Sequence, residues 1–257
     1  METVEYEVRD RIGFITLNRP EKKNALNEEL VKNLSSAFAK ASKDNAVKLV
    51  ILRANGDAFC SGADLAFLQQ LQTFSFDDNL ADSTRLKDLF LQIYTLNKVV
   101  IAQVEGHAIA GGCGLATVCD FIFSVPEAKF GYTEVKIGFI PAIVMVFLVR
   151  KIGDQRARQL LLSGNLIAAE EAASLGLVTR TISKQTIKNE VIAFAQKLIK
   201  SNSTQALTTT KRMIAEVQSL PLEEALHYAA RMNADARGTI DCKKGVAGFL
   251  NKEALEW

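Results

Sequence analysis

The apolar positions in the first part of the chain alternate in some segments and follow a helical spacing in others. VEYEVRDRIGFITLNRP alternates and turns through residues 11–13, which predicts a β-hairpin ending near Pro20. The next segment, NALNEELVKNLSSAFAKASKD, predicts an amphipathic helix with Asn24 or Asn27 as its cap. Its apolar face consists of Leu26, Leu30, Leu34 and Phe38. The run VKLVILRA then predicts a buried strand.

The middle of the chain repeats this order of elements. NGDAFCSGADL is a glycine-bearing loop that leads into a helix, and VVIAQVEGHA and CDFIFSVPEAKFGY predict further strands. Residues 86–96 have a helical pattern, whereas residues 67–86 show no clean period and predict a mobile loop, either a lid or a surface excursion. A unit of two strands and a helix recurs, which favours a layered α/β fold.

The last part of the chain has helical patterns. They begin at residue 143 and continue through residues 186–200, 204–217 and 222–239 to the final segment, CKKGVAGFLNKEALEW. The change from mixed α/β to helical falls between residues 185 and 200. We therefore predict an α/β core at residues 1–195 and a helical region at residues 196–257, which docks on the core or on a neighbouring subunit.

Composition limits the classes of partner. With 257 residues, of which 48% are hydrophobic, the chain can bury a large core. The net charge is only +2, so neither nucleic acid nor an anionic membrane is indicated as the main partner. The N-terminal METVEYEVRD is charged where a signal peptide would be apolar, and no apolar run reaches the roughly 18 residues of a membrane span. We expect a cytoplasmic protein.

The cysteines and histidines do not form a metal-binding pattern. Cys60, Cys113, Cys119 and Cys242 are widely spaced, which predicts free thiols in a reducing compartment, with Cys113 and Cys119 as small core residues. The chain has no CxxC or HExxH motif and only two histidines. A zinc site or a histidine-based nucleophilic triad is therefore not expected.

Residues 105–141, EGHAIAGGCGLATVCDFIFSVPEAKFGYTEVKIGFIP, contain two chemical signals. Gly111 and Gly112 precede the small, apolar segment CGLATVC, which predicts a strand-to-helix turn with close backbone approach. The first amides of a helix have no intrahelical partners and attract negative charge. Glu134 lies in mostly apolar company, where burial would raise the pKa of its carboxyl and prepare it for proton transfer. The alternatives are a glycine pair that serves only packing and a solvated glutamate.

Five ordered segments, FCSGADL, AGGCGLATVCD, FGYTEVKIGFIP, AAEEAASLGLV and GVAGFLNK, resemble the crotonase superfamily of enoyl-CoA hydratases and isomerases. The resemblance covers nearly the whole chain. It implies an α/β fold, a crotonase-type spiral of repeated ββα units with a C-terminal helical region, in a homotrimer or a dimer of trimers. It also implies that a thioester carbonyl of an acyl-CoA substrate accepts hydrogen bonds from the Ala63 and Gly111 amides.

The resemblance also implies where coenzyme A binds. Since coenzyme A is part of the substrate, no separate cofactor is expected. Lys252, from one subunit, would meet the CoA phosphates of its neighbour, with Phe249 against the adenine; the alternative is an exposed amphipathic terminal helix. The other CoA-binding positions are Ala63, Asp64, Leu65 and Gly111. Asp120 matches a family aspartate that we interpret as structural.

One position departs from the family pattern. Hydratases of the family that this chain resembles commonly use two glutamates. The second of these is present here as Glu134, whereas Gly114 occupies the position of the first. GCGLA with TEVKIGFIPAIV resembles bacterial methylglutaconyl-CoA hydratases of leucine degradation and glutaconyl-type hydratases of terpenoid breakdown, in which that glutamate is also commonly absent. A substrate carboxylate would need a cation, with Arg85, Lys87 and Lys136 as candidates.

This resemblance favours an acyl-CoA hydro-lyase that adds water to a 2-enoyl-CoA, with 3-methylglutaconyl-CoA as the preferred substrate and Glu134 as general acid and base. The first alternative is a Δ3,Δ2-enoyl-CoA isomerase that uses the same Glu134. The second is a non-catalytic CoA- or RNA-binding protein that kept the fold.

Overall fold

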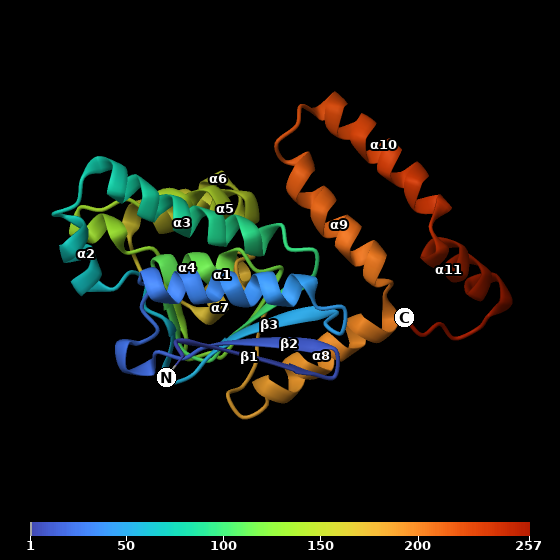
Figure 1. Cartoon of the computed structure of the whole chain (residues 1–257), viewed down its shortest axis with the longest axis horizontal. Helices are drawn as coiled ribbons and strands as arrows, with labels where there is room; N and C mark the ends of the chain where they lie inside the picture. Colours follow the sequence, from blue (N-terminus) through green and yellow to red (C-terminus); the bar gives the residue numbers. More distant parts are fainter. Residues whose placement is uncertain (1) are drawn as a thin grey trace.

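The computed structural model describes residues 2–257, which form two β-sheets surrounded by helices (Figure 1). The six-stranded sheet has the order β1-β2-β3-β5-β7-β10, and the four-stranded sheet has the order β4-β6-β8-β9. The first sheet consists of β1 (Val4–Arg9), β2 (Ile12–Leu17), β3 (Leu49–Ala54), β5 (Val99–Val104), β7 (Phe121–Ser124) and β10 (Arg180–Thr181). The second consists of β4 (Ala58–Cys60), β6 (His107–Ile109), β8 (Lys129–Gly131) and β9 (Ile167–Ala168). The predicted layered α/β fold is confirmed.

The N-terminal hairpin is confirmed, but its turn lies one residue earlier than predicted. Asp10 and Arg11 both have positive φ, 51° and 66°, and Gly13 is already inside β2, paired with Val8. Two consecutive residues with positive φ form the kind of tight turn that suits the twist of an antiparallel pair. The remaining neighbours in this sheet, from β2 to β10, pair in parallel and are largely buried.

Helices cover both faces of the large sheet. In Figure 1, α1 and the helices α3 to α6 lie on one side of it, and α8 lies on the other, where it contacts β5 and β7. The helices are α1 (Glu28–Lys43), α2 (Leu65–Leu71), α3 (Phe76–Tyr94), α4 (Gly111–Thr117), α5 (Ala142–Ile152), α6 (Asp154–Ser163), α7 (Ala169–Ser174), α8 (Ile187–Ser201), α9 (Thr204–Val217), α10 (Leu222–Gly238) and α11 (Ile240–Asn251), with short 3-10 helices η1 (Pro20–Lys22) and η2 (Glu134–Ile137). None of the helices in residues 2–257 combines the length and the apolar character that crossing a bilayer requires.

The prediction of a loop at residues 67–86 is wrong. These residues belong mainly to α2 and to the first half of α3, which begins after Ser75, whose hydroxyl accepts a hydrogen bond from the Asp78 amide. The buried residues of α3 all lie in its second half, and the exposed first half therefore has no apolar stripe to give a period. N-capping by Ser75 is the local signal that would have identified this helix.

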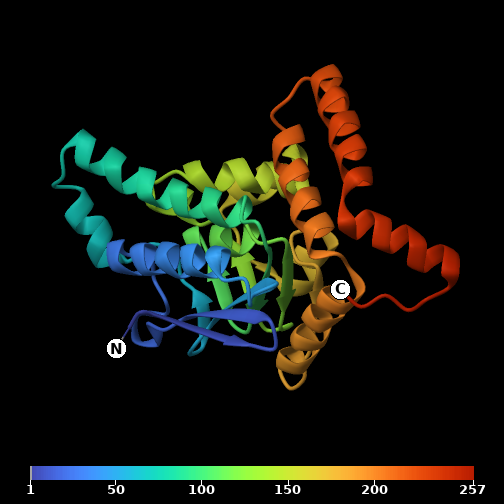
Figure 2. The same ribbon diagram turned by 45° about the vertical axis from the view of Figure 1, so that its right-hand side comes forward.

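The C-terminal helices are fixed to the core by a buried lysine. Lys211, on α9, donates from Nζ to the Asp120 carboxylate (2.7 Å) and to the carbonyls of Ile93 (3.1 Å) and Lys98 (3.0 Å). Asp120 also accepts from the Val100 amide at 2.7 Å. Beyond α9, α10 and α11 project away from the α/β core in both views (Figures 1 and 2), and α10 has no buried residue. The division at residues 195 and 196 stays a prediction.

Replacing Lys211 should destabilise the protein. Lys211→Met leaves the Asp120 carboxylate without its cation, and we expect a loss of about 2 kcal/mol in the free energy of unfolding, less than the 3–5 kcal/mol of a fully buried pair. The smaller value is expected because about a quarter of the Asp120 side chain, 25%, stays exposed. Urea denaturation measures the loss. Arg158→Gln, which breaks an exposed pair with Asp154, is the control and should leave the midpoint nearly unchanged. Equal midpoints for the two variants would contradict this account.

Candidate active site

Three neighbouring parallel strands of the small sheet bring the predicted site residues to one edge. β4 pairs in parallel with β6, and β6 with β8, with Ile109 opposite Gly131. Ala63, Gly111 and Glu134 each follow the carboxyl end of one of these strands within a few residues. The carboxyl ends of parallel strands meet at the same edge of a sheet, which is where ligands bind in open α/β folds. Residues more than seventy positions apart in the chain, from 63 to 134, thus lie around one place.

The two glycine turns pack directly against each other. Gly62 has a φ of 91°, and a Cβ on it would lie 2.9 Å from the Ala110 Cβ and 3.4 Å from the Gly111 nitrogen. A Cβ on Gly112 would lie 2.1 Å from the Cys60 carbonyl oxygen. Side chains at these positions would separate the turns, and glycine is therefore needed at both for close backbone approach.

The peptide group between Gly62 and Ala63 is fixed through its carbonyl. The Gly62 oxygen accepts a hydrogen bond from the Leu26 amide at 2.7 Å, and Leu26 and Ala63 form a parallel bridge. All peptide bonds in the described chain are trans, so the Ala63 N–H points away from Leu26. No acceptor within residues 2–257 is found for this N–H.

The peptide group between Ala110 and Gly111 has the same arrangement. The Ala110 oxygen accepts from the Gly114 amide at 3.0 Å in the first turn of α4, and the Gly111 N–H therefore points out of the helix. Ala110 has φ 51° and ψ −126°, a conformation that costs a residue with a side chain roughly 1–3 kcal/mol. Strain of this kind, held by the surrounding structure, is typical of functional sites.

The other end of α4 is held by a lysine. Lys151, on α5, donates from Nζ to the carbonyls of Thr117 (2.9 Å) and Cys119. A cation at the C-terminus of a helix complements its dipole and completes its last hydrogen bonds. Burial lowers the pKa of Lys151, whereas the nearby Cys119 and Asp120 act in the opposite direction. No local sequence pattern predicts this contact.

Glu134 is a buried carboxyl group with an unused oxygen. It begins η2, keeps 9% of its surface exposed, and its Oε2 has no hydrogen-bond partner in the described chain. Burial raises the pKa of Glu134 above its ordinary value, as expected from its apolar neighbours. A buried acceptor without a partner is costly, and such groups are rare unless they serve binding or catalysis.

A polar pair and a thiol lie near Glu134. The hydroxyls of Thr117 and Tyr132 share a hydrogen bond of 2.7 Å, and Tyr132 is fully buried. Cys113 lies close to both, and burial raises the pKa of its thiol to about 12. Cys113 and Cys119 are buried core residues, as predicted.

The position of the missing glutamate is filled by a neighbouring side chain. A Cβ on Gly114 would lie 2.2 Å from Val144 Cγ1 and 3.0 Å from Phe90 Cε2. No side chain can extend from residue 114 into the site unless Val144 moves. The space next to residue 114 is therefore apolar.

Of the predicted CoA-binding residues, Asp64 and Leu65 lie beside the Ala63 turn. Asp64 caps α2, accepts from the Ala66 amide at 3.0 Å and forms an ion pair with Arg19 at 2.8 Å. Burial would raise the pKa of Asp64, but the hydrogen bonds from Arg19 and Ala66 outweigh it and hold the pKa below its ordinary value. Leu65 is exposed.

Phe249 and Lys252 are not part of the same cluster. Both lie at the end of α11, which is at the opposite end of the molecule from α2 in both views (Figures 1 and 2). The Phe249 side chain is 84% exposed. Their predicted contact with CoA requires a second copy of the chain and stays a prediction.

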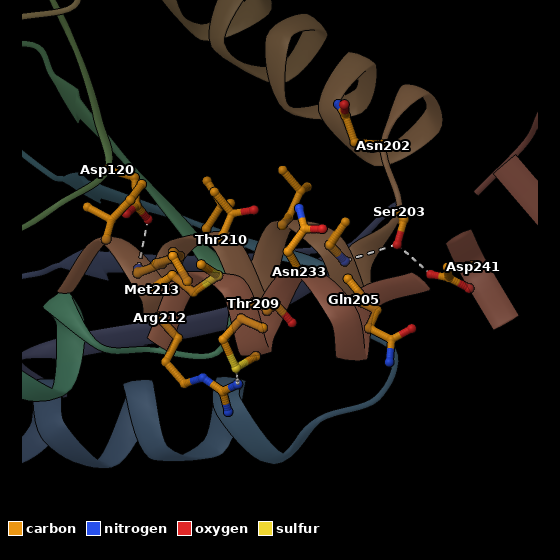
Figure 3. A pocket seen from close by; sticks show the side chains of 18 of the residues that line it. Asp120, Asn202, Ser203, Gln205, Thr209, Thr210, Arg212, Met213, Asn233 and Asp241 are labelled. Atoms are coloured by element: carbon orange, nitrogen blue, oxygen red, sulfur yellow. Dashed lines mark hydrogen bonds and ion pairs between the residues drawn. The ribbon is translucent and has the colours of Figure 1, made fainter. Parts of the chain in front are cut away.

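A cavity of about 1390 Å³ lies elsewhere, between the core and α9 to α11 (Figure 3). Asp120, Ser203, Asn233 and Asp241 are among the residues that line it, whereas Ala63, Gly111 and Glu134 are not. Its ionic groups are partly engaged with one another, since Ser203 donates to Asp241 and Lys211 to Asp120 (Figure 3). In residues 2–257, no cluster of three or more His, Cys, Asp or Glu side chains is placed to bind a metal ion.

Known proteins resemble this chain along nearly its whole length. The model of a family described as enoyl-CoA hydratase/isomerase matches residues 7–257. The chain is 39% identical to a putative enoyl-CoA hydratase of Thermus thermophilus over 95% of this chain and 96% of the relative. It is 32% identical to a crotonyl-CoA hydratase of Syntrophomonas wolfei over 98% of this chain and 96% of the relative.

The solved structures show the same fold. The crystal structure of an enoyl-CoA hydratase from Mycobacterium smegmatis matches with a TM-score of 0.93 and 29% identity, over 100% of this chain and 99% of that chain. The α/β fold of crotonase type is thereby confirmed. Because this match covers both the sheets and the C-terminal helices, the whole chain has the same architecture as that structure.

The packing at Gly114 predicts a destabilised alanine variant. Gly114→Ala should lower the free energy of unfolding by about 1–3 kcal/mol, because its Cβ overlaps Val144. Adding Val144→Ala should recover part of this loss. Gly238→Ala, where a Cβ would meet nothing within 4 Å, is the matched control and should be neutral or slightly stabilising. Chemical denaturation of the four proteins tests this, and Gly114→Ala with wild-type stability would contradict it.

Proposed function

The chain belongs to the enoyl-CoA hydratase/isomerase family, and we propose that it adds water to the double bond of a 2-enoyl-CoA thioester. The observation that carries this proposal is the buried, unpartnered Oε2 of Glu134 at the same sheet edge as the Ala63 and Gly111 amides. The relatives named enoyl-CoA hydratase and crotonyl-CoA hydratase support it.

In the proposed reaction, the thioester oxygen accepts hydrogen bonds from the Ala63 and Gly111 amides. The Glu134 carboxylate takes a proton from water while the hydroxide bonds to C3 of the substrate. Electrons of the double bond move to the thioester, whose enolate oxygen bears the charge between the two amides. Glu134 then returns its proton to C2, and the sum is the addition of one water. Fixed donors aimed at the developing charge stabilise this enolate without reorganisation.

Glu134 performs both proton transfers alone in this proposal. Val144 and Phe90 occupy the space beside Gly114, and a second carboxylate at that position has no room. The same observation favours a second candidate, the Δ3,Δ2-enoyl-CoA isomerase, because a single carboxylate without a water-binding partner suffices to move a proton from C2 to C4.

For the acyl group, we propose 3-methylglutaconyl-CoA. Ile137, Phe139 and Ile140 follow Glu134 with exposed side chains, which supports a branched apolar acyl chain. The substrate's distal carboxylate would need a cation. Arg85 already forms ion pairs with Asp82 and Glu28. Lys87 already forms an ion pair with Asp88. Within residues 2–257, the one hydrogen bond of the Lys136 ammonium is to the amide oxygen of Asn165, at 3.3 Å, and we propose Lys136 as the partner.

We also propose that the chain assembles as a homotrimer or a dimer of trimers. The apolar side chains of α10 and α11 support this, because they are exposed in the single chain: Leu222, Leu226, Ile240, Val246, Phe249 and Leu250. Exposed apolar patches of this kind mark interaction sites. Light scattering after size exclusion should give three or six times the chain mass of 28.2 kDa, and a monomer at micromolar concentration would contradict assembly.

The substrate is tested by the ultraviolet absorbance of the conjugated thioester. We expect it to fall with 3-methylglutaconyl-CoA and, more slowly, with crotonyl-CoA. Inertness toward both, together with formation of a conjugated product from a 3-enoyl-CoA, would favour the isomerase. Binding of CoA thioesters without any reaction would contradict both the hydratase and the isomerase proposals. It would favour the non-catalytic binding protein.

Glu134→Gln should abolish most turnover and stabilise the fold at neutral pH. The folded pKa of Glu134 is raised above its ordinary value of 4.5, so the folded state favours the protonated carboxyl. The wild type therefore loses stability relative to the variant as pH rises from below 4.5 through the folded pKa, and the unfolding free energies of the two proteins converge in acid.

Activity should require the ionised carboxylate and fall in acid with a midpoint above 4.5. Urea denaturation and initial rates across pH measure both. A variant with normal turnover would remove Glu134 from the reaction.

A further inference from the structure

Arg19 connects two segments that surround the Ala63 peptide. Its side chain leaves the loop between β2 and α1, and its Nη1 donates to Asp64 Oδ2 (2.8 Å) and to the Ala25 carbonyl (3.0 Å). Both charged side chains are largely buried, with 16% of Arg19 and 13% of Asp64 exposed. One nitrogen atom thus bonds to residues on both sides of a close backbone crossing.

That crossing determines the direction of the Ala63 N–H. The Leu26 amide donates to the Gly62 oxygen at 2.7 Å, and the Leu26 oxygen accepts from the Asp64 amide at 2.9 Å. Arg19 bonds to the residue before Leu26 and to the residue after Ala63. The contacts therefore clamp residues 25–26 against residues 62–64, with the Ala63 N–H as the free group in the middle.

The loop that carries Arg19 is itself anchored. Asn24 is fully buried, and its Oδ1 accepts from the Arg19 amide at 2.8 Å. Its Nδ2 donates to the carbonyls of Asn55 and Ala58, each at 2.9 Å. Asn24 has a φ of 53°, which asparagine tolerates better than most residues with a side chain. The Arg19 backbone is therefore held next to β4 by the hydrogen bonds of Asn24.

We infer that Arg19 is a positioning residue that aims the Ala63 amide at the thioester oxygen, which goes beyond the proposed hydration and rests on it. In this role Arg19 acts through Asp64 and the Leu26 crossing, and not by direct contact with the reacting atoms. Loss of the clamp lets the Gly62–Ala63 peptide rotate, which weakens a donor needed most when charge is on the oxygen. The effect should fall on turnover more than on substrate binding.

The test compares Arg19→Met, Arg19→Lys and a control variant, Arg53→Met, with the wild type. Arg53 also joins distant segments, bonding to Glu7 at 3.0 Å and to Thr16, but on the hairpin side of the large sheet. Turnover is measured with the best 2-enoyl-CoA substrate. Infrared difference spectra of a bound acyl-CoA with a ¹³C-labelled carbonyl report polarisation of the thioester, and urea denaturation reports stability.

For Arg19→Met we expect kcat to fall by about 10- to 100-fold, below the 10²–10³ of outright donor loss. KM should change by less than about threefold, and the bound carbonyl stretch should return toward its frequency in free acyl-CoA. Arg19→Lys should recover part of both losses because an ammonium can still reach Asp64. Arg53→Met should leave kcat and the carbonyl stretch at wild-type values.

A wild-type kcat and carbonyl stretch in folded Arg19→Met would overturn the inference, as would losses that match those of Arg53→Met. If Arg19→Met does not fold, the test rests on Arg19→Lys. A kcat and a bound carbonyl stretch in Arg19→Lys that both equal the wild-type values would then overturn the inference. Failure of the proposed function is separate, because the wild-type protein would then neither hydrate 2-enoyl-CoA nor shift the bound carbonyl.

Discussion

The site depends on two peptide groups whose carbonyls are hydrogen-bonded while their N–H groups have no acceptor within residues 2–257. The Gly62 oxygen accepts from Leu26, and the Ala110 oxygen accepts from Gly114, so each carbonyl is fixed by the fold. In a trans peptide, fixing the carbonyl also fixes the direction of the N–H. The close contact of Gly62 with Gly111 brings both N–H groups to one edge of the small sheet. A receptor for negative charge is thereby formed by the backbone alone.

This arrangement lowers stability at the site. Ala110 has a strained backbone conformation with positive φ, the buried Oε2 of Glu134 has no hydrogen-bond partner within residues 2–257, and Gly62 and Gly112 lack side chains so that the backbones can approach closely. The compensation comes from elsewhere. Lys151 completes the C-terminus of α4, and Lys211 joins α9 to Asp120. Local strain that persists because its surroundings are well packed is what a preorganised catalytic site requires.

Much of the fold and part of the site follow from local sequence patterns. The hairpin, the buried strands, the C-terminal helices and the Gly111 turn have periodic or glycine signals, and Glu134 is conspicuous as a carboxylate in apolar company. Contacts made by long side chains across the fold have no such signal, and Arg19, Lys151 and Lys211 were therefore missed. The first half of α3 was missed because it buries no apolar face. The contact of Val144 with Gly114 is visible only once α4 and α5 are packed together.

The most direct test of the account replaces the Ala63 amide with an ester by incorporating lactic acid at position 63. The change deletes the N–H and keeps the side chain, so it removes the donor with little effect on shape. We predict a loss in kcat of about 10²–10³ with 2-enoyl-CoA, as for other oxyanion donors. An ester-containing protein with the stability and kcat of the wild type would show that this amide does not receive the thioester oxygen, and would contradict the central claim.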